Sequence, residues 1–337
     1  MSNKVTIKSV LFNITERCTV GCSHCGYIGS RRNREANEKE IGKWVDAICA
    51  YPITNIIFTG GEPFEAIGSL EEGVKASLRG GAKTSIFTSS NWAKSKDLTI
   101  EKLSRVEGIS QLYLSTDDYH QKRVPIQNVY NVIDAALKME SVTVSLCITY
   151  DSRESLKRII SKYKEYEGRV LFHTEKVIPT QFISPTTYDL ALTNLFDPSS
   201  FSCSCYLGTP LINPNGDVIS CHIGKAGAHS SLNHLPYFLG NLFESEFNEI
   251  MDNASTKSAY QFLRTHGPKG IADFIGNNLN LLEVIGRSKF TNGCDLCFSF
   301  LRTSEGREAL EKHISCSSVK EDINIKLALV YNENTID

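Results

Sequence analysis

Short apolar runs alternate with amphipathic stretches through the first half of the chain, and this alternation limits the fold more than any other feature. Six of the runs have the length and composition of buried strands. The strand candidates are residues 10–15, 55–59, 84–89, 111–116, 142–149 and 169–177. Residues 128–139 and 156–163, between them, repeat apolar positions at helical spacing. The pattern predicts an α/β fold of parallel strands with right-handed crossovers, either a doubly wound sheet or an open barrel.

Three cysteines follow the first predicted strand. Cys18, Cys22 and Cys25 form a C-x3-C-x2-C run. Three thiolates this close hold three irons of a 4Fe–4S cluster and leave the fourth iron open to a chelating ligand, whereas four cysteines close the cluster. Zinc sites use ligand pairs separated by a longer loop, and His24 lies between two of the cysteines, so the spacing fits zinc poorly. The run predicts a cluster site.

The second predicted strand ends in Gly60-Gly61-Glu62-Pro63. The two glycines allow the backbone to turn sharply and to lie close to a ligand, because no Cβ intervenes. Glu62 supplies a carboxylate at the carboxyl end of a strand, where barrel enzymes keep their ligands. Taken alone, the same residues also suit a plain strand-to-helix turn with a solvated glutamate.

Together the two motifs resemble those of a known family. Residues 18–25 resemble the radical SAM signature, in which an aromatic residue precedes the third cysteine, and His24 fills that position beside the cofactor. Residues 60–63 look like the GGEP motif of the same family. The resemblance implies a partial (β/α)6 TIM-like barrel. It also implies that S-adenosylmethionine chelates the open iron, that residues 60–63 contact its ammonium group, and that one electron cleaves it to methionine and a 5′-deoxyadenosyl radical.

The third and fourth predicted strands end in further polar side chains. Thr88 and Ser89 occupy a position that binds the ribose and carboxylate of the cofactor in the family, although the glycine usual there is absent. Ser115 and Asp117 resemble the family's S-x-D strand end, which faces the ribose or the substrate. His120 is a candidate proton carrier because the pKa of histidine lies near neutrality, or alternatively a structural hydrogen bonder.

The C-terminal third carries a second set of cysteines. Residues 211–219 predict a β-hairpin around a Pro-Asn-Gly-Asp turn, with Cys205 and Cys221 beyond its two ends. Cys294 and Cys297 complete a set of four ligands, suited to an Fe–S cluster or to structural zinc. The arrangement resembles the SPASM/twitch extension of radical SAM enzymes. That resemblance implies a small hairpin and helical domain with an auxiliary 4Fe–4S cluster.

The remaining cysteines have weaker signals. Cys203 is a candidate hydrogen-atom donor to a substrate radical, since S–H bonds are weaker than most C–H bonds, or simply a spare buried cysteine. Cys316 is able to approach the auxiliary site from the C-terminal tail. Cys49 and Cys147 fall on a predicted helix and strand, and we interpret them as small buried apolar residues.

Within the family, the nearest likeness is to the radical SAM peptide epimerases. It rests on residues 117–120, on the interval from Cys205 to Cys221, and on the Phe-Thr-Gly-Gly-Glu strand end. Those enzymes remove an α-hydrogen from a peptide residue and return another from a thiol that follows the hairpin ligand. This chain has His222 there, so Cys203 or the tail cysteine has to replace that donor.

Composition sets the remaining limits. The 337 residues predict two domains, a barrel over 1–185 and an auxiliary domain with the tail over 186–337. Lys and Arg number 36 against 38 Asp and Glu, a net charge of −2, so no nucleic acid or membrane surface is expected as a partner. Eleven cysteines without an export signal predict a reducing cytoplasm and metal binding.

Three hypotheses follow. The first is a radical SAM enzyme that receives electrons from flavodoxin or ferredoxin and abstracts hydrogen from a peptide or other natural-product precursor. The second is a small-molecule enzyme whose auxiliary cluster binds substrate or donates sulfur. The third is a non-catalytic Fe–S scaffold or redox protein.

Overall fold

The computed structural model describes most of the chain. The described residues are 5, 7–25, 34–139, 141–177, 189, 195, 197, 208–221, 234–278 and 280–331. The strands are β1 (Ser9–Asn13), β2 (Asn55–Thr59), β3 (Lys83–Thr88), β4 (Gln111–Ser115), β5 (Thr143–Tyr150), β6 (Leu171–Lys176), β7 (Leu211–Ile212), β8 (Asp217–Ile219) and β9 (Phe238–Asn241).

The helices fall into two groups. Those of the first half are α1 (Glu38–Cys49), α2 (Ile67–Arg79), α3 (Lys96–Ser104), α4 (Asp118–Gln121), α5 (Ile126–Ala136) and α6 (Arg153–Ser161), with short 3-10 turns η1 (Pro63–Glu65) and η2 (Lys164–Tyr166). Those of the second half are α8 (Phe247–Ser255), α9 (Ser258–Gly276), α10 (Asn280–Ile285), α11 (Gly293–Leu301), α12 (Ser304–Ile314) and α13 (Ser317–Lys326), followed by a π-helical turn η6 (Leu327–Tyr331).

All nine strands belong to one sheet, in the order β6-β5-β4-β3-β2-β1-β7-β8-β9. Strands β1 to β6 are parallel and adjacent in chain order. A doubly wound sheet places later strands on both sides of the first, so this order is that of a barrel. In the described part of the chain β6 and β9 form the two edges, and the barrel is open. The six predicted strands are therefore confirmed, each within two residues at either end.

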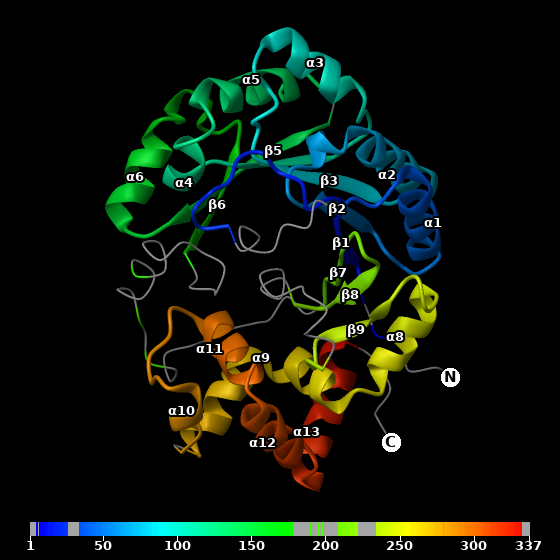
Figure 1. The fold of residues 1–337 in the computed structure, drawn as a ribbon, viewed down its shortest axis with the longest axis vertical. Helices are drawn as coiled ribbons and strands as arrows, with labels where there is room; N and C mark the ends of the chain where they lie inside the picture. The colour runs from blue at the N-terminus through cyan, green and yellow to red at the C-terminus, as the bar shows by residue number, and fades with distance from the viewer. Residues whose placement is uncertain are drawn as a thin grey trace.

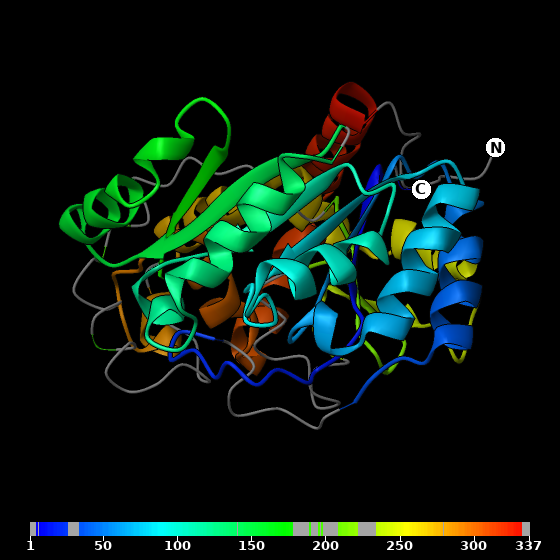
Figure 2. The ribbon, with the colours of Figure 1, turned by 90° about the horizontal axis from the view of Figure 1, so that it is seen from above.

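Helices of the first half cover the outer face of the strands, and those of the second half gather on the other side (Figure 1). Figure 2, seen from above, shows the same two layers with the strands between them. Strand residues that face the first layer, such as Ile86, Leu112 and Leu146, are fully buried. Helix α1 begins at Asn37, whose side chain accepts from the amide of Glu40 while the Glu40 carboxylate accepts from Asn37 N.

The predicted hairpin over 211–219 is confirmed as β7 and β8, which pair antiparallel around a turn with Gly216 at a φ of +80°. The hairpin lies beside the first strand of the barrel sheet. Strand β7 pairs in parallel with β1, Leu11 opposite Leu211 and Phe12 opposite Ile212, so the hairpin continues the barrel sheet. The boundary predicted near residue 185 lies outside the described residues. No helix in the described part combines the length and hydropathy of a membrane span.

Candidate functional site

The cysteine run leaves the carboxyl end of β1 and forms a small apolar cluster of its own. Val20, Cys22 and Val124 are buried there, and Cys18 and Cys25 pack against them. The amide of Cys25 donates to the carbonyl of Cys22 at 3.1 Å, which closes a tight turn. The three thiols predicted as iron ligands are thus brought together in an apolar surrounding, and this donor set suits a cluster with one open iron.

Neighbouring strand ends hold this loop in place. The amide and hydroxyl of Thr19 donate to the Glu65 carboxylate at 2.9 and 2.6 Å, and the side-chain amide of Asn91 donates to the Thr19 hydroxyl at 3.0 Å. Arg17 forms an ion pair with Glu35 at 2.7 Å and also donates to the carbonyl of Glu65. Residues that follow β2 and β3 therefore fix the backbone between the first two cysteines.

The two glycines after β2 approach the chain's own backbone. A Cβ on Gly60, whose φ is +151°, would lie 2.5 Å from the carbonyl oxygen of Thr15, and one on Gly61 would lie 2.1 Å from that of Arg17. The amides of Gly61 and Glu62 donate to these same two oxygens at 2.6 and 2.8 Å. The close approach that the structure shows for the glycines is to the entry of the cysteine run, and their predicted approach to a ligand stays a prediction.

Glu62 is fully buried and joins the ends of β2 and β3. Its carboxylate accepts from the Thr88 hydroxyl at 2.7 Å, from the Ser89 amide at 2.9 Å and from the Ser89 hydroxyl, and its own turn adds the amide of Phe64 at 3.3 Å. Burial raises the pKa of Glu62, while these hydrogen bonds act in the opposite direction. Pro63, also buried, starts η1. Three side chains predicted to bind the cofactor, those of Glu62, Thr88 and Ser89, are thus hydrogen-bonded among themselves.

Asp117 is 1% exposed and connects three elements. One carboxylate oxygen caps α4 by accepting from the amides of Tyr119 and His120 at 3.0 and 2.9 Å, and it also lies 2.9 Å from Nδ1 of His120. The other accepts from the amide of Thr149 at 3.2 Å and lies 4.0 Å from Nε2 of His24. Asp117 therefore orients His120 and lies near His24.

The pKa values of His24 and His120 are shifted in opposite directions. Burial, with His120 nearby, lowers the pKa of His24 to about 4 despite the Asp117 carboxylate. Burial acts in the same direction on His120, but Asp117 and a hydrogen bond with Cys22 outweigh it and raise the pKa of His120 well above its ordinary value. Nδ1 of His24 is buried without a hydrogen-bond partner in the described part of the chain. Neutral His24 therefore offers an unused polar atom beside the cysteines.

The ligating atoms of His24, Asp117 and His120 all lie within 4.8 Å of one another, a grouping able to hold a metal ion. The hydrogen bonds argue against one. Nδ1 of His120 donates to Asp117, whose same oxygen already accepts two amides. The geometry is that of a carboxylate orienting an imidazole.

Ser115, predicted to face the ribose or the substrate, ends β4 half-buried and lies in register with Cys147 of β5. Both lie on the strand face opposite fully buried Leu114 and Leu146. Cys147 is half-buried rather than part of the core as predicted, and burial, with nearby Asp117, raises its pKa to about 12. Side chains alternate between the two faces of the sheet along β4 and β5. This alternation in the sequence predicts that Ser115 and Cys147 share a face, which the sequence analysis above did not state.

The second cysteine set is described in part. Cys203 and Cys205 lie outside the described residues. Cys221 follows β8, Cys294 and Cys297 lie one turn apart on α11, and Cys221 and Cys297 both pack against the main core.

Tyr237 lies at this second set, and the sequence reasoning missed it. Burial raises the pKa of Tyr237, and the electrostatic effects of Cys221 and Cys297 add to the shift. Its hydroxyl is buried without a hydrogen-bond partner among the described residues. The carbonyl of Tyr237 accepts from the amide of Ser220 at 2.8 Å, which brings it beside the residue before Cys221. Thiols around an unpaired phenol suit a metal group that accepts its hydrogen bond.

Comparisons with known proteins agree with this geometry. Residues 12–167 match the family model of the Radical SAM superfamily. YydG of Bacillus subtilis (strain 168), whose name refers to peptide biosynthesis, is 20% identical over 308 residues, 88% of this chain and 93% of its own. The solved structure of native anSMEcpe with bound AdoMet and Cp18Cys peptide aligns with a TM-score of 0.54 and 13% identity, over 94% of this chain and 99% of its own. This likeness confirms the open α/β barrel.

Proposed function

We propose that this chain, a radical SAM enzyme by its domain over residues 12–167, removes a hydrogen atom from a peptide as the first step of modifying it. The observation that carries the proposal is the apolar cluster of Cys18, Cys22 and Cys25 at the carboxyl end of β1, held by the Gly-Gly-Glu backbone. The choice of a peptide is supported by the names of the two relatives, YydG and anSMEcpe with its bound peptide.

Cys18, Cys22 and Cys25 would hold the 4Fe–4S cluster, with S-adenosylmethionine beside them. When bound, these groups supply the electron and the adenosyl radical that takes the substrate hydrogen. The chain's own residues do the rest. Val20 and Val124 pack against the cysteines and limit the access of solvent to a cluster held there. The unused Nδ1 of His24 is a contact for a polar group of the cofactor.

The residues of the strand ends divide into contacts and positioning groups. The Glu62 carboxylate accepts hydrogen bonds from Thr88 and Ser89. We therefore assign these three residues to positioning the backbone that faces the cofactor, rather than to contacting the cofactor with their side chains. Asp117 positions His120, which stays a candidate proton carrier. Ser115 has no such network and remains the candidate that contacts ribose or substrate.

We also propose that Cys205, Cys221, Cys294 and Cys297 hold an auxiliary 4Fe–4S cluster in a twitch-like arrangement. Its support is that Cys221 and Cys297 pack against the same core and both act electrostatically on buried Tyr237. The same assignment keeps Cys203 as candidate hydrogen-atom donor, and flavodoxin or ferredoxin as cytoplasmic electron donor.

The test begins with anaerobic reconstitution and an iron count. We expect about eight irons per chain, since each 4Fe–4S cluster holds four. With dithionite and S-adenosylmethionine the protein should form 5′-deoxyadenosine, and deuterium from a labelled peptide substrate should appear in it. Cys22→Ala should abolish this product, whereas Cys316→Ala, a change at an exposed cysteine, should not. Full product formation by Cys22→Ala would refute the proposal.

A further inference from the structure

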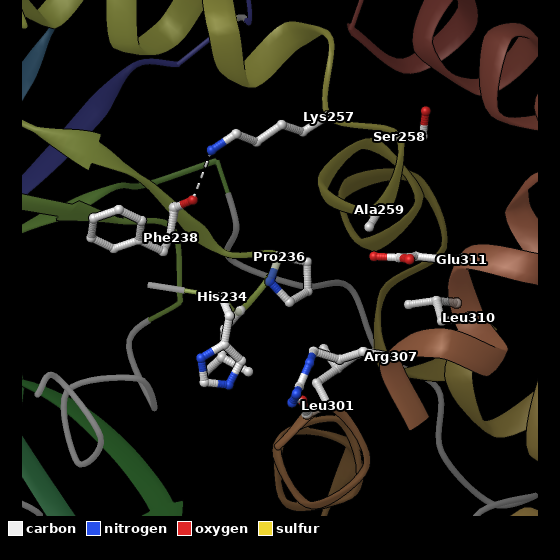
Figure 3. A pocket seen from close by; sticks show the side chains of 11 residues that line it. His234, Pro236, Phe238, Lys257, Ser258, Ala259, Leu301, Arg307, Leu310 and Glu311 are labelled. Carbon is white, nitrogen blue, oxygen red and sulfur yellow. Dashed lines mark hydrogen bonds between the residues drawn. The ribbon is translucent and has the colours of Figure 1, made fainter. Parts of the chain in front are cut away.

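A cavity of about 380 Å³ lies in the second half of the chain, between the start of β9, the N-terminus of α9, the end of α11 and α12. Figure 3 shows its lining side chains, which come from all four of these segments. None of them belongs to the cysteine run or to the ends of β1 to β6. The volume is in the range of sites that bury a small ligand or a few side chains.

Arg307 and Glu311 of α12 both line this cavity, and they do not form an ion pair with each other. They are four residues apart on one helix, a spacing at which opposite charges usually pair. Yet no carboxylate of the described residues lies within ion-pair distance of Arg307. One of its terminal nitrogens donates to the carbonyl of Leu301 at 2.9 Å, which fixes the guanidinium at the cavity wall.

The rest of the wall holds one further cation and a helix N-terminus. Lys257 precedes helix α9 and gives it no side-chain cap, so the positive end of the helix dipole opens here. The Lys257 ammonium donates to the carbonyls of Phe238 and Leu239 at 3.0 and 3.1 Å, and the first of these bonds is drawn in Figure 3. His234 adds an imidazole. Half-buried Pro236 and Ala259 supply apolar surface.

We propose that this cavity docks a segment of the peptide substrate that carries an acidic side chain next to an apolar one. The planar guanidinium of Arg307 matches a carboxylate with two parallel hydrogen bonds. The apolar neighbour lies over Pro236 and Ala259, and Glu311 accepts from the peptide's own N–H groups. A bare inorganic anion fits less well, because Glu311 repels it and it makes no use of the apolar surface.

This inference rests on the proposed function, since it takes the substrate to be a peptide. It adds a second point of attachment, remote from the cysteine run, that selects peptides by a sequence outside the reacting residue. The lining residues are all distinct from the cysteine run and from the strand-end residues assigned above, so binding here is testable apart from the chemistry.

The experiment is a calorimetric titration of the full-length protein with two probes, acetyl-Leu-Glu-Leu-amide and its Leu-Gln-Leu counterpart. Neither cofactor cleavage nor a reductant is needed. The glutamate probe should bind about tenfold more tightly than the glutamine probe, since a charge-assisted pair is worth roughly that factor. Arg307→Ala should lower its affinity about tenfold. Glu311→Gln should raise it or leave it unchanged, and exposed Arg302→Ala, the matched arginine control, should have no effect.

Because Arg307→Ala should lower the affinity and Glu311→Gln should not, the two variants separate binding from misfolding, since a damaged fold weakens both. Equal affinity for the two probes, or equal losses in Arg307→Ala and Arg302→Ala, would overturn the inference. Competition by inorganic phosphate as strong as by the glutamate probe would also overturn it, in favour of a plain anion site. If the probes behave as expected while no peptide yields 5′-deoxyadenosine, the proposed function fails and the cavity assignment stands.

Discussion

His24 shows how one residue between two cysteines changes the stability of the site with pH. Its folded pKa of about 4 lies below the ordinary value of 6.5, so only the unfolded chain takes up this proton between those limits. Stability from His24 is fully present above pH 6.5 and is lost as pH falls towards 4. His120, whose pKa is raised, acts in the opposite sense and loses its contribution as pH rises.

We therefore predict that His24→Phe makes the metal-free protein less sensitive to acid. Phenylalanine keeps the ring contact with Tyr119, whose centroid lies 4.6 Å away, but does not titrate. Between pH 7 and 4.5 the wild type should lose up to about 3 kcal/mol more free energy of unfolding than the variant, from a shift of roughly two units. Urea denaturation at the two pH values measures this. Identical slopes for the two proteins would contradict the prediction.

Tyr237 permits a second prediction at this scale. Its hydroxyl is buried without a partner among the described residues, so Tyr237→Phe should stabilise the metal-free protein by about 1 kcal/mol. Once the auxiliary cysteines hold metal, the hydroxyl has sulfur to bond, and the advantage should vanish or reverse. Thermal unfolding before and after reconstitution tests both halves. The matched control is Tyr51→Phe, which removes a hydroxyl bonded to the carbonyl of Val5 and should destabilise in both states.

At the scale of elements, the joint between β2 and the cysteine run tolerates little change. Gly61→Ala places a Cβ 2.1 Å from the carbonyl oxygen of Arg17, which has to move. We predict a loss of several kcal/mol of unfolding free energy, on the order of other severe steric insertions. The iron bound on reconstitution should fall in parallel. Gly276→Ala, at a position where the new Cβ meets no atom within 4 Å, is the control and should bind iron normally.

The elements themselves were largely predictable, and the contacts between them were not. Buried parallel strands read as apolar runs such as residues 55–59, and the Pro-Asn-Gly-Asp turn fixes its hairpin locally. The pairing of β7 with β1 joins residues 200 positions apart, for which no local pattern exists. Glu62, Asp117 and His120 were recognised as polar strand-end residues. Their partners, Ser89 and Thr149 among them, lie on neighbouring strands and become visible only in the fold.

At the scale of the whole molecule, the shared sheet argues that the two predicted domains do not fold separately. Leu11 and Phe12 of β1 are buried, and their backbone pairs with β7. A chain truncated after residue 185 exposes this edge, and an exposed apolar edge strand invites pairing between molecules. We predict that the truncated chain aggregates. Size-exclusion chromatography tests this, and a monodisperse, folded fragment would show that the barrel stands alone.

The same pairing has a consequence for electrons. Strand β1 leads towards Cys18 and strand β8 leads towards Cys221, so the two cysteine sets are attached to strands of one sheet with only β7 between them. For the two clusters that we propose, the distance an electron has to tunnel is therefore set by backbone geometry. Substitutions around either set therefore retune its redox potential while the length of the path stays constant.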